Sequence, residues 1–399
     1  MTALASRDMT QRRTLVSACV AHAMHDGFID GILIFLPVFQ AQFGLTYAAV
    51  GLLRATATGA MATLQIPAGQ MAERAGSRAV LAGGTAAAAA GYLLAGFSQN
   101  LAGVFAALAL VGVGASVQHP IASELIAATT TGARRRMALG IYNFTGDVGK
   151  TIVPPLAALL LSVLDWRLVC GIICGMGLIV AAWVAAQLPA DTHATSAASD
   201  AGGIPHRAPS SATPFRVLFV IGIFDSAARM AFLTFLPFLL AAKGGALEIV
   251  GLALSLLFVG GAAGKFACAW LSTRIGPIST VIVSEVLTGA LVLAVAFLPL
   301  IAALACLPLL GAALNGTSSV LYGSVAELVS DDRRRRAFAV FYTATVGSGA
   351  IAPVVAGLFV DRAGLFAMSV SVAVLALAIV PLALALRSAF AALDTKNMS

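Results

Sequence analysis

The sequence predicts an all-α integral membrane protein with twelve transmembrane helices, arranged as two repeats of six. Three observations lead to this fold class. The 399-residue chain is 60% hydrophobic and only 10% charged, whereas soluble domains average about 25% charged residues. Stretches such as 290–314 and 366–386 contain no charged residue and are too long for the core strands of a soluble protein. Finally, the two halves of the sequence resemble each other.

Turn-forming and charged residues divide the chain into twelve apolar segments. Each is long enough to form one membrane-spanning helix, which needs about 20 residues. In order, the segments are 14–40, 46–70, 77–98, 101–127, 135–161 and 167–188, then 214–240, 247–271, 276–297, 299–328, 335–360 and 364–387.

The stretch between the sixth and seventh segments has a different composition. Residues 189–213 are rich in Ala, Ser, Thr, Pro and Gly and show no apolar periodicity, which is typical of a flexible linker. We therefore expect an N-terminal six-helix bundle over 1–188, a flexible cytoplasmic linker over 189–213 and a C-terminal six-helix bundle over 214–399.

The halves repeat in a fixed register, because adding 200 to a first-half position often recovers the same residue. The matches include Leu36-Pro37 with Leu236-Pro237, Val50-Gly51-Leu52 with Val250-Gly251-Leu252, Arg74 with Arg274, and Gly76 with Gly276. Parallel six-helix repeats around a central binding site are a known design of membrane transport proteins.

The net charge of +7 follows this topology and does not indicate nucleic-acid binding. With the N-terminus in the cytoplasm, most loop Lys and Arg residues fall on the cytoplasmic side, including the clusters 134–136 and 333–336. The opposite side holds only Arg167, Lys243 and Arg362. This positive-inside bias places both termini in the cytoplasm.

The cysteines and glycines indicate no further chemistry. The five cysteines lie within apolar segments, and their odd number and lack of C-x-x-C spacing argue against disulfides and a metal site. The Gly-rich patches Gly83-Gly84 and Gly260-Gly261 are not phosphate loops, because no G-x-x-x-x-G-K-[ST] pattern occurs. We therefore expect no cofactor, no metal and no ATP hydrolysis.

The first apolar segment is unusually polar. It carries His22, His25, Asp26 and Asp30. Residues 22, 26 and 30 follow one another at intervals of four and fall on one face of a helix. Ionisable groups at membrane depth are costly and face a polar cavity or a partner rather than lipid. The pattern therefore indicates a hydrophilic site inside the bundle.

The loop between the second and third segments carries a recognisable motif. Gly69-Gln-Met-Ala-Glu73-Arg74-Ala-Gly76-Ser-Arg78 resembles the G-x-x-x-D-R-x-G-R-R loop of the major facilitator superfamily. Glu73 stands where Asp is usual, and Ser77 replaces the first of the paired basic residues. The second-half copy keeps Arg274 and Gly276. Length, spans, linker and repeat also agree, so the resemblance covers nearly the whole chain and implies the major facilitator fold.

Three local patterns are similar to the fosmidomycin-resistance type of efflux carrier within that superfamily. They are the polar first span followed by Pro37 and Phe43-Gly44-Leu45-Thr46, the step Ser116-Val117-Gln118-His119-Pro120, and Gly146-Asp147-Val-Gly149 with Pro155. The G-P-x-x-G-G signature of antiporters is not met, since Gly146-Asp147 stands where Gly-Pro would be. Pro120 lacks an N–H and should kink the fourth span beside His119.

In this superfamily spans 1, 4, 7 and 10 line the cavity, and spans 2, 5, 8 and 11 flank it. The resemblance therefore implies a substrate cavity formed by His22, His25, Arg54, His119, Asn143, Lys150, Asp225, Arg229 and Lys265. Several cations in one cavity favour an anionic substrate. Glu285, in span 9, departs from this division, and a pair with Lys265 on the adjacent helix is one account of it.

Three carboxylates are candidates for proton coupling: Asp26, Asp30 and Asp147. A carboxylate in a semi-dry cavity can load and release protons, and Asp26 lies closest to the midpoint of its span. The alternative is a static hydrogen-bonding network that holds span 1 to span 5.

Two charged pairs have the spacing of intrahelical ion pairs. Asp147 and Lys150 are three residues apart, and Asp225 and Arg229 are four apart. A structural role, in which each helix covers its own charge, and a switchable role, in which substrate or a proton displaces one partner, both remain open.

The resemblance also implies a latch at the cytoplasmic ends of the helices. Its members are Gly69, Glu73, Arg74, Gly76, Arg78, Glu124, Arg274 and Glu327. The alternative is that these basic loops only set the topology.

Together these features predict a secondary active transporter that works by alternating access and is not an enzyme. We expect proton-coupled export of a small polar or anionic compound. A second candidate function is proton-coupled uptake of an organic anion, and a third is divalent metal transport. We expect a monomer in the bacterial inner (plasma) membrane, with a small-molecule substrate, protons and the lipid bilayer as its partners and no nucleic acid.

Overall fold

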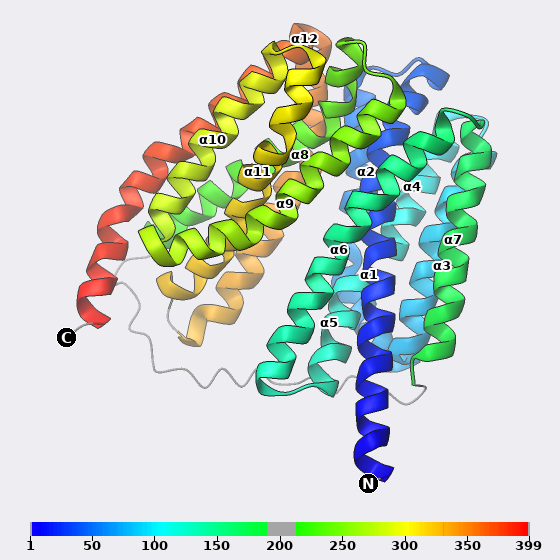
Figure 1. Cartoon of the computed structure of the whole chain (residues 1–399), viewed down its shortest axis with the longest axis horizontal. Helices are drawn as coiled ribbons and strands as arrows, with labels where there is room; N and C mark the ends of the chain where they lie inside the picture. Colours follow the sequence, from blue (N-terminus) through cyan, green and yellow to red (C-terminus); the bar gives the residue numbers. More distant parts are fainter. Residues whose placement is uncertain (1, 190–212, 330, 398–399) are drawn as a thin grey trace. The chain divides into compact units, whose positions relative to one another are not determined.

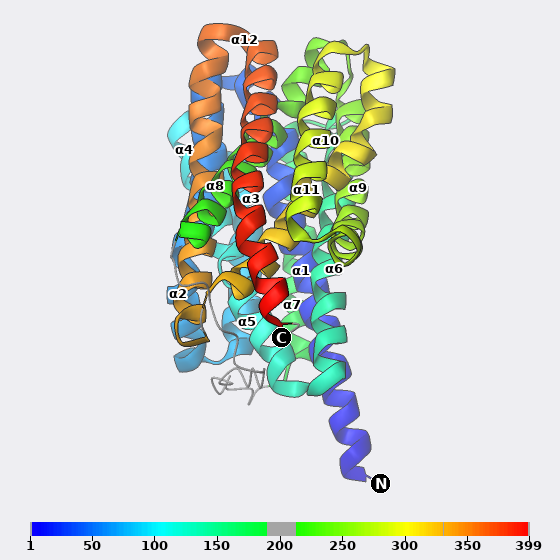
Figure 2. The ribbon, with the colours of Figure 1, turned by 90° about the vertical axis from the view of Figure 1, so that its left-hand side faces the viewer.

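The computed structural model describes residues 2–189, 213–329 and 331–397. Every regular element in these ranges is an α-helix, as Figures 1 and 2 show from two sides. The helices are α1 (Thr2–Phe43), α2 (Tyr47–Ala75), α3 (Ser77–Phe97), α4 (Leu101–Ala115), α5 (Gln118–Thr129), α6 (Gly132–Leu161), α7 (Trp166–Gln187), α8 (Thr213–Ala242), α9 (Leu247–Ile275), α10 (Pro277–Phe297), α11 (Leu300–Leu328) and α12 (Asp331–Asn397).

Ten helical stretches in the described part of the chain are long and apolar enough to cross a membrane. One of them, Leu101–Thr129, joins α4 and α5, and another, Arg336–Arg387, contains the last two expected spans. α2 forms a 29-residue helix but is outside this set. It carries the charged residues Arg54, Glu73 and Arg74. The helices thus follow the expected segments along the whole described chain.

The fourth expected span is broken into α4 and α5 by a turn at Ser116 and Val117. Pro120 explains the position of the break. Its nitrogen carries no hydrogen for the carbonyl of Ser116, and its ring clashes with that carbonyl in a continuous helix. The expected kink beside His119 is therefore present as an interruption of the helix.

Three glycines end or divide helices with a backbone that other residues rarely adopt. Gly76 follows α2 with a φ of 84°, and Gly276 follows α9 with a φ of 83°. Gly364, with a φ of 85°, separates the two helical segments within α12. A side chain at positive φ is strained, so the repeated Gly76 and Gly276 share a structural cause.

The chain forms two compact units. The N-terminal unit comprises 1–45, 52–200 and 247–255, and the C-terminal unit comprises 46–51, 201–246 and 256–399. The first turns of α2 and α9 are thus grouped with the opposite unit, and these two segments occupy equivalent positions of the repeat. The predicted linker lies almost entirely outside the described residues, so the domain boundaries stay a prediction.

The same packing order occurs in both units. In the N-terminal unit α1 packs against α6, and α3 packs against both α7 and α4. In the C-terminal unit α8 packs against α12, and α10 packs against both α12 and α11. The sequence repeat is therefore also a repeat of helix contacts. The N-terminal turns of α1 extend beyond the ends of α5 and α6 (Figures 1 and 2).

Small residues let α1 and α6 approach closely. A Cβ atom on Gly149 of α6 would lie 1.8 Å from the carbonyl oxygen of Ala23, and one on Gly27 would lie 2.4 Å from Val153. Close helix packing through glycine is common in membranes, where van der Waals contact drives association. This contact brings the polar face of α1 against α6.

Candidate functional site

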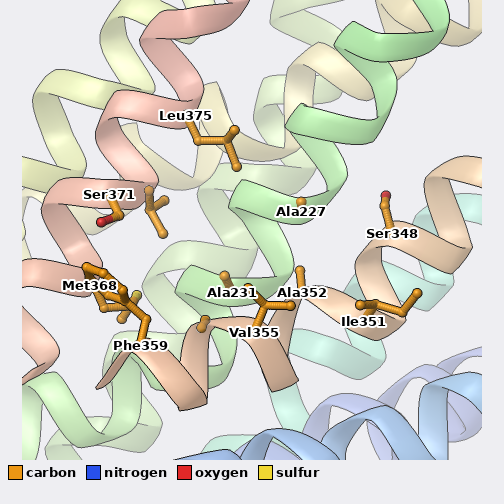
Figure 3. Close-up of a pocket in the computed structure, with 12 residues that line it drawn as sticks. Ala227, Ala231, Ser348, Ile351, Ala352, Val355, Phe359, Met368, Ser371 and Leu375 are labelled. Carbon is orange, nitrogen blue, oxygen red and sulfur yellow. The ribbon is translucent and has the colours of Figure 1, made fainter. Parts of the chain in front are cut away.

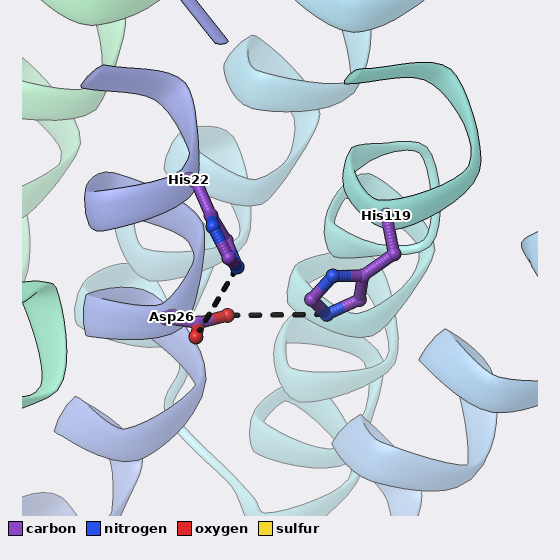
Figure 4. A group of neighbouring side chains, drawn as sticks. All are labelled: His22, Asp26 and His119. Carbon is purple, nitrogen blue, oxygen red and sulfur yellow. Dashed lines mark ion pairs between the residues drawn. The ribbon is translucent and has the colours of Figure 1, made fainter. Parts of the chain in front are cut away.

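Asp26 lies at the centre of a cluster of basic side chains in the N-terminal unit. Its Oδ2 atom is 3.1 Å from Nζ of Lys150 on α6 and 3.4 Å from Nε2 of His22, one turn earlier on α1. Its Oδ1 atom is 4.0 Å from Nε2 of His119 on α5. Figure 4 shows both imidazole rings directed at the carboxylate. One acid is thus shared by three basic groups from three helices.

The cluster is buried on one side and accessible on the other. The side chain of His22 is 3% exposed and that of Asp26 is 14% exposed, whereas Lys150 is 27% and His119 is 38% exposed. The side chains of Lys150 and His119 are therefore the partly exposed members of the cluster, whereas His22 is its buried member.

The orientation of His22 is fixed by α6. Its Nδ1 atom is 2.7 Å from the backbone carbonyl oxygen of Tyr142, and its ring stacks on the Tyr142 ring at 4.1 Å between centroids. A carbonyl oxygen only accepts hydrogen bonds, so Nδ1 must carry a hydrogen. In neutral His22 the Nε2 atom that faces Asp26 is then an unprotonated acceptor.

Nε2 of His22 is buried and has no hydrogen-bond partner within the described part of the chain. An unprotonated Nε2 and an ionised carboxylate present lone pairs to each other across 3.4 Å. A single proton on either group converts this repulsive contact into a hydrogen bond. The geometry is therefore that of a place where a proton can be held.

Asp147 and Lys150 form the expected contact within α6, but it is the longer of the two that Lys150 makes. Nζ of Lys150 is 4.0 Å from Asp147 and 3.1 Å from Asp26. The side chain of Asp147 is 10% exposed. Lys150 thus connects two carboxylates and is held mainly by the one on α1.

Asp30 has a separate partner. Its Oδ1 atom accepts a hydrogen bond of 2.7 Å from Arg54 of α2, which also donates to the carbonyl oxygen of Ile29. The side chain of Arg54 is only 1% exposed. Asp30 and Arg54, predicted as a coupling carboxylate and a cavity residue, form a closed, buried ion pair with each other.

His25 lies on a third side of α1. Its Nε2 atom is 2.9 Å from the hydroxyl oxygen of Thr85 on α3. Thr85 donates its hydrogen to the carbonyl of Leu81, so it accepts from His25. The side chain is buried, and its described hydrogen bond joins α1 to α3 rather than to the Asp26 cluster.

The remaining predicted cavity residues are scattered. Asn143 is exposed on α6, and Lys265 is half-buried on α9. In the C-terminal unit Asp225 and Arg229 of α8 form the expected intrahelical pair, at 3.6 Å between Oδ2 and Nη2. Glu285 of α10 hydrogen-bonds Asp225 and Thr317, and its suggested pair with Lys265 stays a prediction.

The predicted latch residues lie near helix ends. Glu73 and Arg74 are exposed in the last turn of α2, and Glu124 is half-buried on α5. Glu73 and Glu124 are close enough to interact electrostatically. In the other unit Arg274 lies over the ring of Trp270, 5.1 Å from its centroid. Gly69 and Arg78 are half-buried, and Glu327 is exposed.

One cavity in the C-terminal unit is apolar. It has a volume of about 460 Å³ and lies between α8 and the two segments of α12 (Figure 3). Its lining includes no charged side chain, and its two serines, Ser348 and Ser371, donate to carbonyls of their own helix. It therefore has no group that would bind an anion.

Two site residues were not predicted from the sequence. Tyr142 acts through its backbone carbonyl and its ring face, which give no local signal in a sequence. Glu285 did have a signal, since it is an acid within an apolar segment, but its partner lies on a helix remote in sequence. Packing of both α8 and α10 against α11 brings the two acids together at this point.

The comparisons agree with this architecture. The family model of the Major Facilitator Superfamily matches residues 18–221 and 218–396. The chain is 26% identical over 162 residues to the Fosmidomycin resistance protein of Escherichia coli (strain K12). That match spans 40% of this chain and 40% of the relative.

Among solved structures, the chain is similar to a bacterial homologue of the human lysosomal transporter Spinster. Its inward-facing occupied and inward-facing unoccupied structures match with TM-scores of 0.78 and 0.75. Each is 15% identical and covers 94% of this chain and 96% of that one. At this identity the likeness concerns the fold. The helical repeat, the membrane-spanning segments and the family match together make this protein a multi-pass membrane transporter that belongs to the Major Facilitator Superfamily.

Proposed function

We propose that this transporter couples proton movement to the export of a small polar or anionic compound, with Asp26 as the proton-binding group. The observation that carries the proposal is the contact between Asp26 and His22. The Tyr142 carbonyl keeps the hydrogen of His22 on Nδ1, so the 3.4 Å contact with Asp26 becomes favourable when one proton is bound.

Export by antiport requires that substrate and proton compete for the same group. Asp26 meets this requirement for a substrate that donates a hydrogen bond to the ionised carboxylate. Such a substrate and a proton cannot occupy the same oxygen, so binding of one releases the other. Lys150 and His119 are the more exposed basic groups beside Asp26 and are suited to hold an anionic group of the same substrate.

The name of the relative from Escherichia coli supports the export direction, since that protein is a Fosmidomycin resistance protein. Resistance to a compound is consistent with its removal from the cell. Mid-membrane binding and alternating access of two six-helix units are the general mechanism of such transporters.

One observation favours uptake of an organic anion with a proton as the second candidate. Lys150 is held 3.1 Å from Asp26. A proton on Asp26 removes the negative charge and leaves the ammonium group available for an anion. Proton and anion then bind together rather than in competition, which is the behaviour of a symporter.

Purified protein in lipid vesicles distinguishes the two. A pH-sensitive dye inside the vesicles reports proton movement while a panel of neutral and anionic compounds is added outside. Opposite movement of protons and substrate supports export, and movement in the same direction supports uptake. Asp26→Asn is expected to abolish the coupled signal, whereas Cys19→Ala, on the same helix, serves as the control. Unchanged coupling in Asp26→Asn would remove this residue from the mechanism.

We further propose that both termini lie in the cytoplasm of a bacterium, that the protein sits in the inner membrane, and that it acts as a monomer. The excess of Arg at the loops 134–136 and 333–336 supports the orientation. The residues Glu73, Arg74 and Glu124 would then form the cytoplasmic latch. Labelling of single cysteines introduced into each loop by an impermeant reagent tests the orientation.

A further inference from the structure

A second cluster of charged and polar side chains, with two buried acids, lies within the C-terminal unit. It consists of Asp225 and Arg229 on α8, Glu285 on α10, and Thr317 on α11. Asp225 is 5% exposed and Glu285 is 2% exposed. The three helices that carry these residues are all long and apolar enough to span a membrane. Such a cluster at membrane depth indicates function unless its charges cancel.

The charges cancel only if one carboxyl group is neutral. Two ionised carboxylates and one guanidinium leave a net charge of −1 in a buried site, which costs several kcal/mol. Arg229 lies 3.6 Å from Asp225 and also acts electrostatically on Glu285. One arginine balances one of the two acids, so the other acid requires a proton.

The hydrogen bonds lead independently to the same result. The side chains of Asp225 and Glu285 are hydrogen-bonded to each other. Ionised carboxylates only accept hydrogen bonds, so two carboxyl groups can bond to each other only when a proton lies between them. The arrangement is of the kind in which two acids share one proton.

Thr317 of α11 holds Glu285 from another side, because it hydrogen-bonds this carboxyl group. Its hydroxyl oxygen also lies 2.8 Å from Oγ of Ser284 and 3.1 Å from the carbonyl oxygen of Ala313. The single hydroxyl hydrogen can be donated to any of these acceptors, so this contact positions Glu285, and the requirement for a shared proton comes from the bond to Asp225.

The other titratable groups that face the pair do not replace this proton. Among the described interactions, Arg229 of α8 is the cation that acts on both acids, Cys268 of α9 interacts with Glu285, and Tyr322 of α11 interacts with Asp225. Tyr342 of α12 faces Tyr322. A cysteine thiol and a tyrosine hydroxyl carry no positive charge in either of their protonation states.

A small cavity connects one end of the pair with a polar space. It has a volume of about 60 Å³, and its lining includes Asp225, Arg229, Ser226, Tyr322 and Thr345. This is enough room for a few water molecules, each of which needs roughly 10–15 Å³ measured in this way. Asp225 borders the cavity and Glu285 does not, so a proton can reach Glu285 through Asp225.

We propose that Asp225 and Glu285 share one proton and form a second proton-binding site, in the C-terminal unit. The site is distinct from Asp26 and His22. Its participation in transport rests on the proton coupling proposed above, but its occupancy by a proton does not.

Infrared spectroscopy of the full-length protein in lipid vesicles tests the site without a substrate. A protonated carboxyl group has a C=O stretch that an ionised one lacks, and this band shifts in D₂O. We expect the band at neutral pH in the unmodified protein and its loss in Glu285→Gln and in Asp225→Asn. Each variant leaves one acid balanced by Arg229, and the new amide donates the hydrogen bond that the proton supplied.

Two further variants complete the test. Thr288→Val, one turn along α10, alters a buried hydroxyl without removing a carboxyl group and should keep the band. Arg229→Gln removes the balancing cation, so both acids should be protonated and the band should increase about twofold. An identical spectrum in Glu285→Gln and the unmodified protein would overturn the proposal. A lost band without proton movement in the vesicle assay would support this site and count against the proposed coupling.

Discussion

A Cβ atom placed on Gly146 of α6 would lie 2.5 Å from the carboxylate oxygen Oδ2 of Asp26 on α1. The same atom would lie 2.7 Å from the ring of His22. Glycine at this position is therefore what allows α6 to pass the contact between Asp26 and His22 at close range. Gly146, the residue that this chain shares with the Gly-Pro pattern, therefore has a direct structural role.

Gly146→Ala is expected to displace Asp26 from Lys150 and to lower stability by about 1–3 kcal/mol, as overpacking does. Gly140→Ala is the matched control, because a Cβ atom on Gly140 of the same helix meets nothing within 4 Å. Thermal unfolding in detergent and the vesicle transport assay measure the two effects. If the two variants unfold at the same temperature and transport equally well, then α6 can shift to accommodate the added methyl group without disturbing the site.

Much of the fold was predictable because it depends on composition along single helices. Apolar length indicated the spans, Pro120 indicated the interruption of the fourth, and the paired Gly76 and Gly276 marked equivalent turns of the repeat. The division of α12 has a geometric cause, the φ of 85° at Gly364. The division falls at the boundary between the spans expected over 335–360 and 364–387. Composition predicted this boundary but could not predict the backbone angle.

The site was predictable in part. Helical spacing placed His22 next to Asp26, as found. It also grouped Asp30 with them, yet eight residues at about 100° each leave Asp30 rotated by roughly 80° from His22. Asp30 therefore meets Arg54 of α2, while His22 meets α6. The partners of Asp26 and of Glu285 come from helices remote in sequence, and no local pattern identifies them.

The Asp30–Arg54 pair is expected to stabilise the fold rather than to carry a transported proton. Removing one partner of a buried ion pair leaves an unpaired charge and costs about 3–5 kcal/mol. Arg54→Met should therefore unfold readily, and Arg54→Met combined with Asp30→Asn should recover much of the loss. Thermal unfolding of the three proteins checks this. A stable Asp30→Asn variant that has lost proton coupling would instead assign Asp30 to the mechanism.

Lys150 is expected to determine the preference for anionic compounds. Its side chain is 27% exposed beside Asp26, and a charge-assisted hydrogen bond to a ligand is worth about 1.5–3 kcal/mol. Lys150→Ala should weaken the binding of anionic ligands by about tenfold or more and that of neutral ligands much less. Ligand-dependent thermal stabilisation measures both classes. A similar loss for both would indicate that Lys150 only holds α6 to α1.

The His22, Asp26 and His119 donors also resemble a metal site, since their ligand atoms lie within 4.8 Å of one another. Lys150 argues against a cation there, because its ammonium group is 3.1 Å from Asp26. Two positive charges at about 4 Å repel by several kcal/mol even at moderate dielectric. We therefore expect weak zinc binding to the unmodified protein and binding at least about tenfold tighter in Lys150→Met. Calorimetric titration with zinc measures both, with His119→Gln in the Lys150→Met background as the control that should lose the gain. Tight zinc binding to the unmodified protein, unaffected by Lys150→Met, would instead favour transport of a divalent metal.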